Sequence, residues 1–316
     1  MEGAYYNGQY LNRLERLGYS QAEIDNKLES TFEEMFYGPE GVRLCHCAGP
    51  DMMYIEDTGN HDVRTEGMSY AMMFCVQMNR QKEFDCLWRW VVTHMYLTEG
   101  ENAGYFAWSC HTDGSKNSDG PAPDGEEFFA MSLFFAANRW GSGEGVLDYA
   151  SWARRILHAC VHKGEEAGSG FPMWNPENHL IKFIPNCEFT DPSYHLPHFY
   201  ELFALWSDEC DRPFWHAAAA ASRQYLRKAC HARTGLSAEY AEYDGRPHRG
   251  DQPDRHDWFF SDAYRTLGNI ALDAQWFGDK DGWAQETAAH IQQFFEEKEH
   301  GQTNGIYLID GTPVEG

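Results

Sequence analysis

The 316-residue chain has no apolar run of the ~18 residues that a membrane-spanning helix needs. The longest run, over residues 128–137, is much shorter and contains Ser132. The N-terminus also lacks the basic head, the apolar segment and the small-residue cleavage site that direct export. We therefore expect a soluble protein that works in the cytoplasm.

Positive charge is scarce, because 25 Lys and Arg oppose 49 Asp and Glu and leave a formal net charge of −24. A surface of this sign repels nucleic acid and anionic membranes, so we expect neither as a partner. The nine cysteines are odd in number and scattered. Several of them, such as Cys75 and Cys86, fall on the apolar stripes of expected helices, where a thiol acts as a small hydrophobe. This pattern favours a reducing compartment.

Strand signals are nearly absent, whereas helical periodicity recurs along the chain. Aromatic residues make up 15% of the sequence, enough for a large core, which excludes disorder. The first expected helix, over residues 20–37, begins with the capping pair Ser20 and Glu23 and ends at Gly38. Further helices are expected at residues 66–79, 82–97, 124–139, 146–163, 193–207, 212–230, 257–276 and 281–298. No linker separates the helix pairs, so we predict one all-α domain over residues 1–316, with helical hairpins in a closed double ring.

Three carboxylates share one local context, since each begins an expected helix and is flanked by glycine or aromatic residues. They are Glu66, Asp124 and Asp262. Taken singly, each has an ordinary explanation: Glu66 complements a helix dipole, Asp124 caps a helix, and Asp262 is solvated beside Arg265. Gly67 is unusual in a first turn, because it costs the helix ~1 kcal/mol relative to Ala and allows a close approach to the backbone.

Together, the three carboxylates supply what hydrolysis of a glycosidic bond requires. One carboxyl must hold a proton for the leaving oxygen, and another must stay ionised to activate water or to attack carbon. Apolar surroundings and a like charge raise a carboxyl pKa, and Trp108 and Asp124 would provide both for Glu66, although a helix N-terminus opposes this. Aromatic loops over residues 104–111 and 171–176 offer flat surfaces for stacking sugar rings.

Histidines suggest a competing hypothesis, a metal site. His158 and His162 are spaced i, i+4 and would face one side of a helix, and Cys45-His46-Cys47 adds soft donors. No third ligand has a recognisable spacing and no CxxC pair is present. The sequence therefore predicts a structural histidine pair and no metal site.

Two further function classes stay open at this point. A sugar isomerase or epimerase on a similar helical ring would use histidines as acid and base, and His61, His111 and His195 keep that possible. An inactive carbohydrate-binding protein would keep the aromatic residues and lose the acid or the base. Because candidates for both are present, a hydrolase is favoured.

Five ordered segments resemble glycoside hydrolase family 8. They are residues 62–70, 105–108, 123–126, 191–197 and 261–265. Within the family they look most like the reducing-end xylose-releasing exo-oligoxylanases. The resemblance implies a single (α/α)6 barrel, no cofactor, and substrates that are short β-1,4-linked xylose chains, from which the reducing-end xylose is released.

The resemblance also implies an inverting mechanism with assigned residues. Glu66 would be the general acid, and Asp262 the general base that activates water. Asp124 would hold and distort the sugar at the cleavage point, and Tyr194 would help to hold the water. Two further residues would bind the same sugar, namely Arg64 and Trp108. Inversion predicts that the acid and the base lie ~6.5–9.5 Å apart, with room for a water.

The chain departs from these relatives at its C-terminus. Members of the exo-acting group continue past a segment like residues 307–313 into a loop with His and Pro and then into further helices, whereas this sequence stops at Gly316. We therefore expect a truncated chain whose barrel lacks its C-terminal helices. Because the absent loop confines the leaving side to one sugar, an endo-acting β-1,4-xylanase or glucanase is the nearest alternative.

Overall fold

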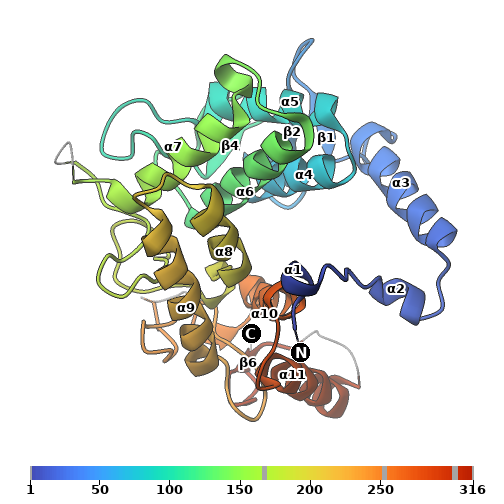
Figure 1. Ribbon diagram of the computed structural model, residues 1–316, viewed down its shortest axis with the longest axis vertical. Coiled ribbons are helices and arrows are strands. Elements are labelled where there is room, and N and C mark those ends of the chain that lie inside the picture. The colour runs from blue at the N-terminus through green and yellow to red at the C-terminus, as the bar shows by residue number, and fades with distance from the viewer. Residues whose placement is uncertain (1, 166–168, 251–254, 301–304, 315–316) are drawn as a thin grey trace. The chain divides into compact units, whose positions relative to one another are not determined.

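The computed structural model describes residues 2–165, 169–250, 255–300 and 305–314. Helices dominate these ranges (Figure 1). The chain divides into two compact units, one of residues 10–159 and one of residues 1–9 with 160–316. In the described ranges, no helix combines the length and the apolar character needed to cross a membrane.

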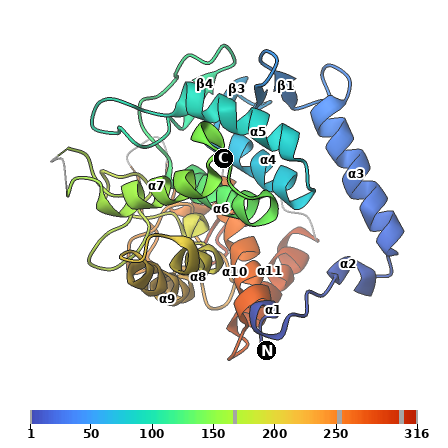
Figure 2. The same ribbon diagram turned by 45° about the horizontal axis from the view of Figure 1, so that its top comes forward.

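The unit of residues 10–159 is built on helices that pack over two short strand pairs. Helices α4 and α6 lie side by side in both views (Figures 1 and 2). Its core includes the rings of Trp88, Phe106 and Phe129, with Phe106 and Phe129 centroids 5.2 Å apart. The helical elements are α2 (Arg13–Arg16), α3 (Gln21–Tyr37), α4 (Thr65–Gln77), α5 (Gln81–Trp90), the π-helix η1 (Val91–Met95), α6 (Pro123–Trp140), the 3-10 turn η2 (Gly145–Leu147) and α7 (Tyr149–His162), which continues unbroken past residue 159.

The other unit is arranged around α8, α9 and α10. Helix α8 packs against both α9 and α10 (Figure 2). Arg223 of α9 donates to both carboxylate oxygens of Asp273 on α10, at 2.8 and 2.7 Å, which fixes this pair of helices. The helical elements are α1 (Ala4–Asn7), η3 (Pro192–Tyr194), α8 (Pro197–Trp206), α9 (Arg212–Ala229), η4 (Ser261–Tyr264), α10 (Arg265–Phe277) and α11 (Trp283–Glu299).

The expected helices are largely confirmed, and the clearest case is α3. Ser20 and Glu23 form the predicted capping box, in which the Glu23 N–H donates to Ser20 Oγ at 3.3 Å and the Ser20 N–H donates to Glu23 Oε2 at 2.8 Å. The helix ends at Tyr37, where the Gly38 N–H donates to the Glu34 carbonyl. Local sequence signals therefore set both ends of this helix.

A few short strands accompany the helices that the sequence predicted. Among the described residues they form three antiparallel pairs, each of two strands and too short to show an alternating pattern. They are β1 (Cys45–Cys47) with β2 (Met53–Ile55), β3 (Asp62–Arg64) with β4 (Ser109–His111), and β5 (Trp258–Phe259) with β6 (Tyr307–Leu308).

The helix expected from residue 257 begins later than predicted. Strand β5 and the 3-10 turn η4 precede α10, which begins at Arg265. The reason lies in the backbone of Ser261, whose φ of 45° falls in the left-handed region and cannot continue a right-handed helix.

Candidate active site

Strand β3 leads directly into α4 and places Glu66 in the first turn of that helix, as predicted. Arg64 is the extended residue before the helix, and it pairs across the ladder with Ser109. The Thr65 N–H donates to the Trp108 carbonyl at 3.0 Å, and the Thr65 hydroxyl donates to Glu66 Oε2 at 3.3 Å. The β3–β4 pair thus fixes where α4 begins and where its first carboxylate lies.

Arg64 and Trp108, which the family resemblance assigns to one sugar, lie side by side. The Arg64 guanidinium carbon is 5.1 Å from the Trp108 ring centroid, within the range of a cation–π contact. Arg64 Nε donates to Asp62 Oδ1 at 3.0 Å, and the other Asp62 oxygen accepts the Ser109 hydroxyl at 2.9 Å. This network holds a cation and a flat aromatic face in one fixed arrangement.

The first turns of α4 and α6 approach each other closely at Gly125. A Cβ on Gly125 would lie 2.4 Å from Thr65 Cβ and 2.6 Å from Thr65 Oγ1, so only glycine fits there. We expected the close approach at Gly67 instead, but a Cβ at Gly67 would lie 3.4 Å from Ile55 Cγ2, which is ordinary contact. The expectation for Gly67 is therefore wrong, and Gly125 is the residue that lets the two helix starts meet.

Asp124 does not cap α6, contrary to the simplest explanation of its position. The helix begins at Pro123, and its N-cap is Ala122, so Asp124 already lies within the first turn. Its side chain is buried, and Oδ1 accepts the Gly125 N–H at 3.0 Å. A buried carboxylate at this point, next to the contact of α6 with α4, needs an explanation other than capping.

Glu126 is a third acidic group of this region that sequence reasoning missed. It is fully buried, and its Oε1 accepts the Phe106 N–H at 3.0 Å. Burial raises the pKa of Glu126 well above its usual range, and the negative charges of Asp124 and Glu66 raise this pKa further. The three carboxyl groups are therefore close enough to interact electrostatically. Burial and the two neighbouring carboxylates both favour the protonated form of Glu126. A charged residue followed at once by the apolar stretch of α6 was the available signal.

Asp262 and Tyr194 lie together in the other unit, linked by Arg265. Arg265 approaches Asp262 Oδ2 to 3.2 Å, and its guanidinium carbon is 5.6 Å from the Tyr194 ring centroid. The Asp262 side chain is 44% exposed, so solvent reaches it. The left-handed backbone of Ser261 lies immediately before Asp262, and such strain is concentrated at functional sites.

Asp191, which lies within the electrostatic influence of Arg265 and Asp262, is a second acidic residue that sequence reasoning did not single out. Its Oδ1 accepts the Ser193 N–H at 2.6 Å at the start of η3, and Asn269 of α10 donates to the Ser193 carbonyl at 2.7 Å. Burial raises the pKa of Asp191 to about 8, although the nearby Arg265 guanidinium lowers it. This carboxyl therefore holds a proton at neutral pH while it anchors the turn that carries Tyr194.

Most of the aromatic residues proposed for sugar stacking belong to the core. Tyr105 and Phe106 are fully buried. Trp174 is 1% exposed and packs edge-on against Trp215, with centroids 5.0 Å apart. The stacking role is wrong for these three residues, because no face of their rings reaches solvent. Trp108 is partly exposed, so a stacking role for this ring stays a prediction.

The histidines offered for an isomerase do not form an acid–base pair. His195 is fully buried between the hydroxyls of Thr190 and Ser222, at 3.0 and 2.9 Å. Burial lowers its pKa to about 3, so it is a neutral structural residue at any pH at which the enzyme would work. The exposed His61 instead approaches Glu56, at 2.9 Å.

Comparison with known proteins decides the family. The family model described as Glycosyl hydrolases family 8 matches residues 19–313. The chain belongs to this family. Its sequence is 54% identical over 315 residues to a reducing end xylose-releasing exo-oligoxylanase of Halalkalibacterium halodurans, which covers 99% of this chain and 80% of that protein.

Two further relatives carry the same description. A reducing end xylose-releasing exo-oligoxylanase of Bifidobacterium adolescentis is 55% identical over 298 residues, covering 94% of this chain and 76% of that protein. The solved structure of Rex8A from Paenibacillus barcinonensis complexed with xylose superposes with a TM-score of 0.95 at 54% identity, covering 99% of this chain and 82% of that one. By contrast, Endoglucanase C of Ruminiclostridium cellulolyticum is 27% identical over 320 residues, covering 99% of this chain and 63% of that protein.

Proposed function

We propose that this chain is an inverting glycoside hydrolase that releases xylose from the reducing end of short β-1,4-xylo-oligosaccharides. The proposal rests on a difference in sequence identity between two groups of relatives. Three relatives named for this activity are 54 to 55% identical to this chain, whereas three endoglucanases are 25 to 27% identical to it. The carboxylate groups described above supply the chemistry that this activity needs.

Glu66 is the general acid of the proposed mechanism. It donates its proton to the glycosidic oxygen as the bond to the reducing-end xylose breaks. The buried Asp124 and Glu126 are acidic neighbours of this region, and the Glu66 carboxylate is one of the charges that raise the pKa of Glu126. Arg64 and Trp108, which are in mutual contact, hold the sugar beside Glu66.

Asp262 is the general base. It takes a proton from the water that attacks the anomeric carbon, on the face opposite to the leaving oxygen. Its partial exposure suits a carboxylate that remains open to water, and Arg265 gives it a cationic partner. Tyr194, which is positioned by Asp191 and Asn269 through η3, holds that water.

We also propose that the described helices are part of an (α/α)6 barrel and that residues 1–316 belong to one catalytic domain. We further propose that the protein works in the cytoplasm on imported xylo-oligosaccharides, without a cofactor. The helix-rich architecture and the superposition on Rex8A support the barrel.

Xylotetraose labelled with ¹³C only in its reducing-end sugar tests the substrate and the direction of attack. The proposal predicts that the label leaves entirely in free xylose from the first turnover, with xylotriose as the unlabelled partner. An endo-acting enzyme would instead leave label in xylobiose. Label retained in xylotriose would show attack from the other end of the chain, and either result would overturn the proposal.

The variant Glu66→Gln tests the assignment of the acid in the same assay. Loss of the proton donor is expected to reduce kcat by about 10²–10⁴-fold, with little change in KM, because the amide keeps the shape of the side chain. Near-normal turnover in Glu66→Gln would move the acid role to another residue.

A further inference from the structure

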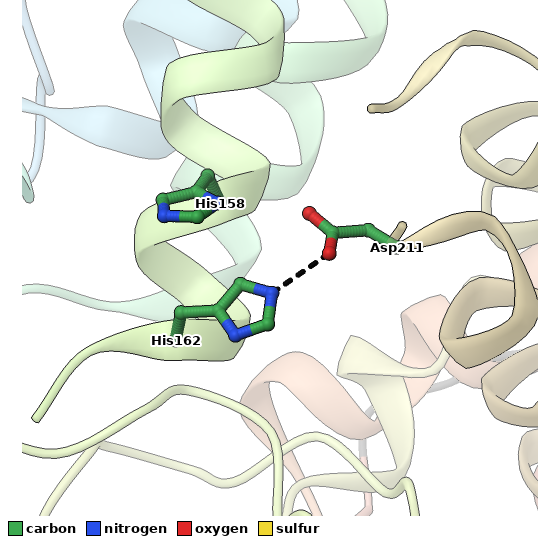
Figure 3. A group of neighbouring side chains, drawn as sticks. All are labelled: His158, His162 and Asp211. Carbon is green, nitrogen blue, oxygen red and sulfur yellow. Dashed lines mark hydrogen bonds and ion pairs between the residues drawn. The ribbon is translucent and has the colours of Figure 1, made fainter. Parts of the chain in front are cut away.

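Helix α7 and the start of α9 bring together three potential metal ligands, none of which is a candidate catalytic residue. His158 and His162 lie on successive turns of α7, and Asp211 immediately precedes α9 (Figure 3). One donor atom from each residue lies within 4.8 Å of the donor atoms of the other two. His162 Nε2 and Asp211 Oδ1 are only 2.7 Å apart.

Nothing in the sequence indicated the third potential ligand, Asp211. The i, i+4 spacing predicted that two histidines share one helix face, and because α7 is unbroken, this spacing alone fixes them one turn apart. Asp211 lies 49 residues beyond His162, a separation that no metal-binding motif prescribes. The sequence thus indicated the two histidines but not the carboxylate beside them.

The surroundings of His162 resemble the support that proteins give to a metal-binding imidazole. Glu165 Oε2 lies 2.8 Å from His162 Nδ1. A carboxylate at one ring nitrogen fixes the orientation of the ring and directs the other nitrogen toward the metal. Here the other nitrogen, Nε2, is the one directed at Asp211.

The position of Asp211 also suits metal binding. It occupies the N-cap position of α9, yet its side chain makes no capping hydrogen bond. The carboxylate is instead buried, with its side chain 3% exposed, and it faces the His162 ring. Burying a carboxylate costs free energy unless a cation or strong hydrogen bonds compensate for it.

We propose that His158, His162 and Asp211 bind one divalent transition-metal ion, with zinc as the expected occupant. Two imidazoles and one carboxylate suit zinc, cobalt or nickel, whereas calcium and magnesium prefer sites made of oxygen alone. Three ligands held at ~2.0–2.2 Å from zinc lie roughly 3.3 Å apart, so small side-chain rotations close the site. A bound ion ties the end of α7 to the start of α9, and a water fills the fourth position.

Metal binding to tag-free, chelator-stripped protein tests this proposal. The expected result is one zinc ion per chain, with a Kd below about 1 μM in competition with a chromophoric chelator, and a rise in Tm on adding zinc. The variants His162→Gln and Asp211→Asn should each weaken binding at least about 100-fold and abolish the rise in Tm. Glu165→Gln should weaken binding about 10–100-fold, because it disturbs only the orientation of the ring.

His216→Gln is the matched control. His216 lies 3.5 Å from Glu201, another histidine–carboxylate contact that involves α9, and this variant should bind zinc like the parent chain. If His162→Gln does not fold, His158→Gln replaces it, with the same expected loss. Zinc binding that is absent from the parent chain, or that is unchanged in Asp211→Asn and the histidine variant, would overturn the proposal. Because no readout is enzymatic, these results do not depend on the proposed hydrolase activity.

Discussion

Gly125→Ala tests whether the contact between α4 and α6 positions the acidic groups. The added Cβ would lie 2.4 Å from Thr65 Cβ, whereas the closest ordinary contact is about 3.4 Å, so the helix starts must separate by about 1 Å. Overpacking of this kind costs about 1–3 kcal/mol of folding stability. A displacement of about 1 Å at a catalytic group also costs about 100-fold in rate. We therefore expect a lower Tm and a kcat reduced by about 100-fold.

Initial rates on xylotriose and thermal unfolding, measured on the same preparation, check this prediction. Gly268→Ala is the control, because Gly268 lies within α10 and a Cβ there meets nothing within 4 Å. That variant should keep the parent rate and be equally or slightly more stable. The swapped pair Thr65→Gly with Gly125→Ala removes the clash and should recover stability. A Gly125→Ala enzyme with the parent Tm and more than half of the parent kcat would refute the reasoning.

Three further predictions concern the other residues of the site. Asp262→Asn should lose hydrolysis while it keeps oligosaccharide binding in calorimetry, and equal loss of both would make Asp262 a binding or structural residue instead. Asp191 has a folded pKa of about 8 against an ordinary value of 3.8, so the folded chain holds an extra proton between these values and its stability should fall as the pH rises from 4 to 8. Asp191→Asn should flatten that dependence in urea unfolding, and an unchanged slope would contradict the assignment. Arg64→Lys should raise KM about tenfold with little change in kcat, because an ammonium lacks the planar stacking on Trp108; an unchanged KM would remove Arg64 from substrate binding.

The sequence predicted features that depend on neighbouring residues. The capping box of Ser20 and Glu23, and the place of Glu66 in the first turn of α4, follow from spacing within one helix turn. The family resemblance likewise rested on short continuous segments, and the family assignment is confirmed over residues 19–313. Such features need no knowledge of the packing.

Features that depend on distant parts of the chain were missed. The tight contact of Gly125 with Thr65 joins residues 60 positions apart, and Asp211 meets His162 across 49 positions. The burial that raises the pKa of Glu126 and of Asp191 also depends on the completed core. The sequence carries no local pattern for contacts of this kind, because packing alone decides them.

The anomeric configuration of the new reducing end tests the central claim most directly. Xylotriose is mixed with enzyme, and the anomeric protons are followed by NMR within the first minutes, before mutarotation equilibrates the product. Attack by a water that Asp262 activates, opposite the oxygen protonated by Glu66, predicts that the xylobiose appears first as the α anomer. Initial release of the β anomer would contradict this assignment of the two carboxylates.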